Sequence, residues 1–364
     1  MSLGQGAKTI TDKLLFAYDM NSKQSFKGKP TTNFIADAGR DCAAEYSGSS
    51  YPFVSQNITS QVQAVWSSSN NTFAMQFEGY REYVDGGSGG GADGYPVMYI
   101  YFTDWSWSTT INRTGYEWSH VGKTFTMPDP TGKSVFFAIY HMNSTNRGKS
   151  HARNFQIEHG NIVTPFVNGT RSNTQAVVDW KGGNTITASS LTYASNNTFS
   201  FNGSSNYIQA PSPLPDRYNW TIEFVAKQNA YVGGQVVLCP SSAGIDQSIR
   251  FNSSGQLYAI FTRIADNNSF AVTASGASSV GEWAHYVVQR TPSNVRIYRN
   301  GVLEADSTQT GISAEWSGTW NIGQRGNSTG WLNGQIAIMR AYDKMLSANE
   351  VKINFNAIRG RFGI

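Results

Sequence analysis

The sequence predicts an all-β protein with two β-sandwiches and one short helix near the C-terminus. Short apolar or alternating segments recur along the 364 residues, and turns rich in Gly, Ser, Thr and Asn separate them. Charged residues make up only 14% of the chain and aromatic residues 13%, which excludes a disordered chain. At roughly 150 residues per domain, this length indicates about two domains.

The strand signals are short runs with a period of two or with continuous apolar character. Phe199 and Phe201 share one face of such an alternating run. Another run ends at Asn300-Gly301, a dipeptide that favours a two-residue hairpin because both turn residues must adopt positive φ. The predicted strands lie at residues 97–102, 134–140, 197–201, 221–225, 284–288, 294–299 and 336–342.

One helix is predicted close to the C-terminus. Ser347 and Glu350 have the spacing of a capping box, in which each side chain bonds a backbone N–H of the other residue. Val351, Phe355 and Ile358 follow on one helical face, which we expect to dock on a sandwich.

Composition excludes several classes of partner and compartment. The net charge is only +4 and the basic residues are scattered, so no nucleic-acid partner is expected. The apolar runs are too short to span a membrane, so no membrane insertion is expected. The first residues have no apolar core, which predicts synthesis in the cytoplasm without a signal peptide. Cys42 and Cys239 are expected to be two unrelated buried thiols.

The residues show no constellation for catalysis, metal binding or a cofactor, so none of the three is predicted. Glycoside hydrolysis needs two carboxylates close together, and Glu223 is expected to be an outward-facing polar residue on a strand. His285 is expected to be a satisfied structural residue, and the five histidines lack metal-ligand spacing. Asp85 and Asp93 flank a Gly-rich stretch that we interpret as a mobile hairpin tip rather than a calcium loop.

The C-terminal half resembles a laminin-G-like or concanavalin A-like jelly roll. The resemblance is carried by several motifs in the expected order, at residues 199–208, 220–224, 283–288, 295–302 and 331–347. Relatives often carry an Asp-Glu pair just after the final Gly-x-Ile, where this chain has Ala337-Ile338. That departure puts an acid-dependent site at this place in doubt.

The version most similar to this one occurs in virion proteins of tailed bacteriophages. The similarity lies in the opening strand at residues 14–19, the segment 25–33 and the end of the chain at 354–364. In these proteins the opening runs soon into a segment that here looks like residues 177–184, far along the chain. The resemblance therefore implies that residues 34–169 are an inserted domain and that 12–33 and 170–358 form one jelly roll. Residues 1–11 would be an anchoring peptide and 359–364 a tail.

The inserted domain resembles the jelly-roll carbohydrate-binding modules appended to glycan-active proteins. The matching motifs lie at residues 118–128, 134–140, 152–160 and 164–166. Trp105 and Trp107 are two residues apart, so on a strand both indoles would project to one face and could stack on sugars. The alternative is that both belong to the core, which is favoured because indoles are mostly buried. Trp66 and Trp331 are further candidates for carbohydrate binding.

These observations predict a structural component of a tailed-phage virion, either a head fibre, a decoration protein or a tail-appendage subunit. It would lie on the virion exterior, contact other virion proteins and bind host-surface polysaccharide. A homo-oligomer is expected, a trimer by resemblance, and Arg359, Arg361 and Phe362 are candidate anchors to neighbouring subunits. The alternatives are a virion glycan depolymerase and an architectural jelly roll that binds no ligand.

Overall fold

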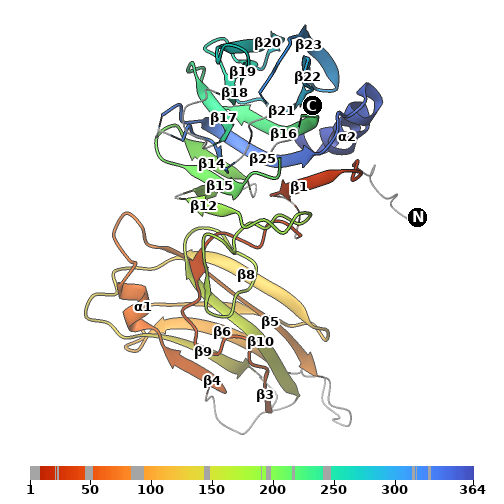
Figure 1. The fold of residues 1–364 in the computed structure, drawn as a ribbon. Coiled ribbons are helices and arrows are strands. Elements are labelled where there is room, and N and C mark those ends of the chain that lie inside the picture. Colours follow the sequence, from red (N-terminus) through yellow and green to blue (C-terminus); the bar gives the residue numbers. More distant parts are fainter. Residues whose placement is uncertain are drawn as a thin grey trace. The chain divides into compact units, whose positions relative to one another are not determined.

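The chain forms two compact units, which are described separately below. Unit 1 comprises Met1–Lys27 and Asn173–Ile364, and unit 2 comprises Gly28–Ser172. Figure 1 shows the computed structural model. It describes residues 9–20, 22, 24–45, 52–82, 94–142, 148–189, 191–193, 198–214, 218–240, 247–313, 316, 318–326 and 329–364. Asp85 and Asp93, the two carboxylates considered for calcium, lie outside these residues.

Unit 1 is a sandwich of antiparallel sheets, as the strand pattern of the C-terminal half predicts (Figure 1). One sheet has the order β13(Thr192–Tyr193), β14(Phe199–Asn202), β25(Asn333–Tyr342), β16(Trp220–Gln228), β21(Ala284–Arg290), β22(Asn294–Arg299) and β23(Val302–Thr308), with β1(Leu14–Asp19) also on β25. The other has the order β12(Thr187–Ser189), β15(Tyr207–Pro211), β24(Thr319–Ile322), β17(Gln235–Pro240), β18(Ser248–Phe251), β19(Gln256–Thr262) and β20(Ser269–Ala277).

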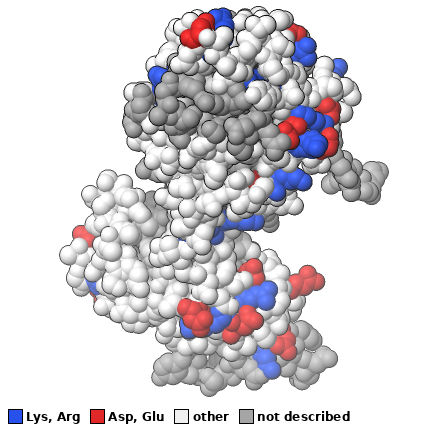
Figure 2. All heavy atoms as spheres, in the orientation of Figure 1, with Lys and Arg blue, Asp and Glu red and all other residues white. Residues whose placement is uncertain are grey.

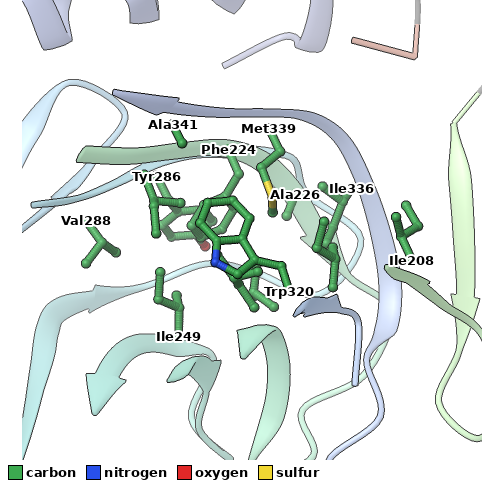
Figure 3. Packing of buried hydrophobic residues seen from close by; sticks show 14 of the residues in the cluster. Ile208, Phe224, Ala226, Ile249, Tyr286, Val288, Trp320, Ile336, Met339 and Ala341 are labelled. Carbon is green, nitrogen blue, oxygen red and sulfur yellow. The ribbon is translucent and has the colours of Figure 1, made fainter. Parts of the chain in front are cut away.

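The core of unit 1 lies between these two sheets. In Figure 3, Trp320 of β24 lies among side chains that project from the facing sheet, including Phe224 of β16 and Met339 of β25. Trp220, Trp316 and Trp320 all have an exposed fraction of 0%. Burial of such large apolar side chains is the main stabilising contribution to a sandwich of this kind.

The N-terminal strand completes unit 1 although the whole of unit 2 follows it in sequence. β1 pairs with β25 in antiparallel register, from Leu14 opposite Tyr342 to Asp19 opposite Ile338. The buried carboxylate of Asp179 accepts a hydrogen bond from the Ala17 backbone N–H at 2.9 Å. Asp179, which follows unit 2 in sequence, therefore holds β1, which precedes unit 2.

The helix α2(Ala348–Phe362) begins as predicted but ends later. Ser347 and Glu350 form the complete capping box. The helix continues through Gly360 and stops at Gly363, whose φ of +70° suits a left-handed helix end. The prediction of a separate tail at residues 359–364 is therefore wrong, because most of these residues form the last turn of α2.

Unit 2 is a second antiparallel sandwich of two four-stranded sheets (Figure 1). One sheet has the order β3(Cys42–Glu45), β10(Lys149–His159), β5(Thr72–Glu82) and β8(Ser119–Thr126). The other has the order β4(Val54–Asn57), β9(Val135–Met142), β6(Tyr95–Phe102) and β7(Ser108–Asn112). A short helix that the sequence pattern did not indicate, α1(Thr59–Gln63), follows β4.

The two short strands at the borders of unit 2 pair with each other. β2(Thr31–Thr32) and β11(Thr170–Arg171) form a separate two-stranded ribbon. Residues 28–33 and 170–172 therefore group with unit 2 rather than with the jelly roll.

The all-β fold class is confirmed, including the Asn300-Gly301 hairpin, whose φ angles are +51° and +78°. Both cysteines are thiols; Cys239 is buried and Cys42 is half-buried. In the described part of the chain, no helix is long and apolar enough to cross a membrane.

Candidate functional site

A row of aromatic side chains covers the outer face of one sheet of unit 2. On β6, Met98, Ile100 and Phe102 point into the core of unit 2. Because strand side chains alternate, Tyr99 and Tyr101 point to the opposite, outer face. The same alternation on the neighbouring β9 places Phe136 and Tyr140 on that face, and none of these four outer side chains is fully buried. Together with Trp105 these residues form what we call the aromatic row: Tyr99, Tyr101, Trp105, Phe136 and Tyr140.

The rings of the aromatic row contact one another continuously. Trp105 stacks on Tyr101, with ring centroids 4.4 Å apart and planes 9° apart. The rings of Tyr99 and Tyr140 meet edge to face, with centroids 5.2 Å apart. The ring centroids of Tyr101 and Phe136 are 6.2 Å apart. The result is a continuous aromatic surface across two hydrogen-bonded strands.

Trp105 lies in the turn between β6 and β7, in a backbone conformation that bulky residues rarely adopt. Its φ is +57°, in the left-handed region, and its side chain is 57% exposed. The Asp104 carboxylate accepts hydrogen bonds from the Ser106 N–H at 3.1 Å and hydroxyl at 2.7 Å, and it pairs with Lys133. The Lys133 hydrogen bond lowers the pKa of Asp104, so the carboxylate stays charged and braces the turn. Strain of this kind is typical of functional sites.

The strands that carry the row have uncharged outer positions. Ser55 and Asn57 flank the row on β4, and Ser108 and Thr110 flank it on β7. Partial burial and then the hydrogen bond with Tyr101 raise the pKa of Tyr140 to about 12, so its hydroxyl remains neutral. The site therefore offers ring faces together with neutral hydroxyl and amide groups. On the side drawn in Figure 2, uncharged side chains cover most of the described surface.

The prediction that Trp105 and Trp107 share one face of a strand is wrong. Both lie in or beside a turn, so strand alternation does not apply to them. Trp107 is partly buried and packs against Phe102 and Phe125 in the core of unit 2. Of this pair, only Trp105 joins the aromatic row.

The other two tryptophan candidates lie elsewhere. Trp66 is half-buried after α1, and its Nε1 donates a hydrogen bond to the Met127 carbonyl at 3.0 Å. Trp331 belongs to unit 1, where its ring lies 6.1 Å from that of Tyr207. Neither ring joins the row.

Two of the three candidate anchors contact their own chain. Arg361 forms a two-pronged ion pair with Asp19, at 2.7 and 2.8 Å. Phe362 packs on Trp283, with ring centroids 5.1 Å apart. These contacts hold both residues in α2 of their own unit, and their anchoring role stays a prediction. Arg359 is exposed on α2, and its anchoring role stays a prediction.

A second cluster of chemically capable groups surrounds Glu223 in unit 1. Glu223 faces away from the sandwich core, as alternation predicts, but α2 covers that face and leaves it 0% exposed. The predicted outward orientation is therefore correct, but the side chain lies under α2 and not at the surface. Its carboxylate contacts Arg340 at 2.9 Å, His285 at 3.0 Å, Tyr342 at 3.0 Å and Asn354 of α2 at 2.8 Å.

The Glu223 cluster is built for stability rather than for access. Burial alone would raise the pKa of Glu223, but the Arg340 charge and the bonds from His285 and Tyr342 outweigh it and lower the pKa to about 2. His285 is also 0% exposed, and its Nδ1 finds no hydrogen-bonding partner within the described structure. The carboxylate thus joins β16, β21, β25 and α2 from inside.

The other sheet of unit 2 exposes a different set of aromatic groups. Trp118 is 38% exposed, but the Arg153 guanidinium lies 4.0 Å above its ring and Tyr80 meets it at 4.8 Å. Arg153 also pairs with Glu78 at 2.9 Å. This surface is ionic, and its tryptophan is already in contact with a cation, so it differs from the neutral aromatic row.

Comparison with known proteins identifies the fold of unit 1. Residues 202–352 match the family model described as the concanavalin A-like lectin/glucanases superfamily. No curated protein sequence matches the chain. Among the described residues, no group of three or more His, Cys, Asp and Glu side chains could hold a metal ion.

Several solved structures are also similar to the chain at low identity. One is a structure of botulinum neurotoxin type C, whose cell entry depends on interaction with two ganglioside molecules. It is 15% identical with a TM-score of 0.40, covering 51% of this chain and 50% of the other. The binding domain of botulinum neurotoxin DC in complex with rat synaptotagmin II is 14% identical with a TM-score of 0.42, at 51% and 50% coverage. This chain thus spans about half the length of each. Residues 202–352 have a concanavalin A-like jelly-roll fold.

Proposed function

We propose that this protein binds a neutral glycan on the aromatic row of unit 2 and serves as an adhesin. The observation that carries the proposal is Trp105, an exposed indole held in a left-handed backbone conformation directly over Tyr101. A buried ring would gain stability from packing, whereas a strained and exposed ring gains little. The strain is explained if the ring contacts a ligand.

The chemistry of the row fits sugars. Pyranose rings present C–H faces that stack on aromatic rings, and their hydroxyls bond to neutral donors and acceptors. Tyr140, Asn57 and Thr110 place such groups beside the rings. The match of residues 202–352 to a lectin/glucanase superfamily lies in unit 1, so it supports glycan binding by the chain and not the aromatic row itself.

The proposed activity is binding without cleavage. Glycosidases use two carboxylates that flank the scissile bond. Asp104, beside the row, is already paired with Lys133 and bonded to Ser106. A virion depolymerase is the alternative that the fold class leaves open, and it predicts release of reducing ends.

We propose further that the protein is an exterior component of a tailed-phage virion. The resemblance of the opening strand and of residues 177–184 to such proteins supports this context. Contacts with other virion proteins and a trimeric assembly are part of the same proposal. Immunogold labelling of purified particles with an antibody against this chain tests it, and unlabelled particles would contradict it.

The experiment that tests binding is a screen of neutral and acidic bacterial surface polysaccharides. The wild type, Trp105→Ala and Trp118→Ala are compared, with retention and reducing ends followed together. Trp118 is the matched control because it is an exposed tryptophan of the same unit that directly precedes β8 of the other sheet.

We expect the wild type and Trp118→Ala to retain a neutral polysaccharide, and Trp105→Ala to lose it at an unchanged melting temperature. Equal retention by all three proteins would contradict the aromatic row as the site. No retention of any polysaccharide would favour the architectural alternative, and release of reducing ends would favour the depolymerase.

A further inference from the structure

A shallow groove lies in unit 2 at the end of the sandwich where β6 turns into β7. An indole forms part of its wall, and hydroxyl, amide and carboxylate groups form much of the rest. The lining residues are Gln63, Trp66, Ser67, Ser68, Asp129, Pro130, Thr131 and Gly132.

Trp66 is fixed in this groove from behind. Its indole packs against the core of unit 2, and its Nε1 donates to the Met127 carbonyl at 3.0 Å. Gln63 donates from Nε2 to the Pro130 carbonyl at 3.0 Å, which ties α1 to the opposite wall. The groove is therefore formed before any ligand arrives, as is usual for binding sites.

The polar groups of the groove suit a ligand rich in hydroxyls. Ser67, Ser68 and Thr131 are exposed. Asp129 accepts the Thr131 N–H at 2.9 Å, and hydrogen bonding to Thr131 lowers the pKa of its carboxyl, which keeps an anionic acceptor at the rim. A carboxylate has capacity for several hydrogen bonds and binds sugar hydroxyls well, but it repels an acidic ligand.

The groove and the aromatic row lie on either side of one loop. Residues 129–132 line the groove, and the next residue, Lys133, pairs with Asp104 beside Trp105. The Thr103 N–H also donates to the Ser134 carbonyl at 3.0 Å. A glycan chain that extends from the aromatic row past Trp105 reaches the loop of residues 129–134 first.

We infer that the groove is a second saccharide subsite, so that unit 2 binds a linear neutral glycan chain across both places rather than one terminal sugar. The inference rests on the proposed function of the aromatic row. Rings two residues apart on a strand already lie roughly 7 Å apart, so the row by itself offers more than one stacking position. The groove extends this surface with one more indole and with directional hydrogen bonds.

The test uses the full chain labelled with 5-fluorotryptophan, whose resonances are assigned by single Trp→Phe variants. The probes are neutral disaccharides and linear octasaccharides of glucose, mannose and galactose. The groove is blocked by Thr131→Arg, a change at an exposed position. Thr114→Arg makes the same change at another exposed loop position of unit 2 and serves as the control.

We expect an octasaccharide to shift the Trp66 and Trp105 resonances together, and a disaccharide to shift that of Trp105 at lower occupancy. Thr131→Arg should abolish the Trp66 shift and weaken octasaccharide binding about tenfold, while disaccharide binding and Thr114→Arg stay at the wild-type level. A response of Trp105 to every length, with none at Trp66, would overturn the second subsite and leave the first. No response at Trp105 to any probe would overturn the proposed function as well.

Discussion

The most buried and the most exposed tryptophans of the molecule lie in different units. In unit 1, Trp220, Trp316 and Trp320 are wholly buried between the sheets. In unit 2, none of the four tryptophans is fully buried, and Trp105 is 57% exposed. The fully buried tryptophans therefore lie in unit 1, whereas the most exposed one, Trp105, lies in unit 2.

The position of a tryptophan in the backbone decides whether its indole packs in the core or is exposed. Trp220 and Trp320 lie on strands at positions that face the sandwich core. Trp105 lies on a turn with positive φ, which turns its ring outward onto the sheet. Aromatic content alone therefore does not distinguish core from binding surface.

The largest expected effect comes from removing a core indole. Trp320→Ala deletes a side chain that packs against Phe16 and the facing sheet, and leaves a cavity. We expect a loss of about 3–5 kcal/mol in the free energy of unfolding. Denaturant unfolding followed by circular dichroism measures it, and a loss comparable to that of Trp105→Ala would erase the contrast between the units.

The Glu223 cluster is a second difference between the units, because unit 1 buries charged side chains there whereas unit 2 exposes aromatic rings. Glu223→Gln leaves the buried Arg340 without its counter-charge. Removing one partner of a buried pair costs about 3–5 kcal/mol. Denaturation in guanidinium chloride measures the free energy of unfolding of the wild type and the variant. Glu304→Gln is the comparison, because it removes a more exposed ion-pair partner of Arg299. Equal stability of the two variants would contradict the account.

The same carboxylate predicts an acid dependence. The ordinary pKa of Glu223 is 4.5 and its folded value is about 2, so its contribution is complete above pH 4.5 and is lost as the pH falls from there towards 2. The free energy of unfolding of the wild type should therefore fall through this window more steeply than that of Glu223→Gln. Parallel curves for the two proteins would show that Glu223 is not the group responsible.

A smaller effect is expected at Trp105, where comparing Trp105→Gly with Trp105→Ala separates the cost of backbone strain from the loss of the ring. Glycine adopts positive φ freely, whereas alanine pays about 1 kcal/mol in the left-handed region. We expect Trp105→Gly to be more stable than Trp105→Ala by about this amount, with glycan binding lost in both. Melting temperatures of the two variants measure the difference, and a less stable glycine variant would argue against strain at this turn.

The smallest effect concerns salt. Because the aromatic row is uncharged and the proposed ligand is neutral, salt has few charge–charge interactions to screen and should change the affinity little. We expect the dissociation constant for the retained polysaccharide to change by less than about twofold between low and high ionic strength. Calorimetric titration at both salt concentrations checks this, and a steep weakening in high salt would point to an ionic site such as that around Trp118 and Arg153.

Much of the fold could be predicted from local signals. The alternation at Phe199 and Phe201, the Asn300-Gly301 turn and the Ser347 to Glu350 capping box all depend on neighbours in sequence. The burial of Glu223 could not, because it depends on α2, which docks on that face from more than a hundred residues away in sequence. The end of α2 was also missed, since Arg361 and Phe362 are held by Asp19 and Trp283.

The aromatic row was only partly predictable. A tyrosine signal was present, because Tyr99 and Tyr101 alternate with the apolar residues of one strand, but a continuous apolar run from 97 to 102 does not show which face of the strand is exposed. Trp105 was chosen from its spacing to Trp107, whereas its exposure comes from the turn that Asp104 and Lys133 brace. Turn conformation and cross-strand partners depend on tertiary contacts that a spacing rule does not contain.

Hydroxyl-radical footprinting shows whether a bound polysaccharide covers Trp105. The oxidation rate of each tryptophan is measured by peptide mass spectrometry, with and without the neutral polysaccharide retained in the screen. We expect the polysaccharide to slow oxidation of Trp105 several-fold and to leave the oxidation rate of Trp118 unchanged. Bound polysaccharide that leaves Trp105 as reactive as in the unliganded protein, or that protects Trp118 instead, would contradict this expectation.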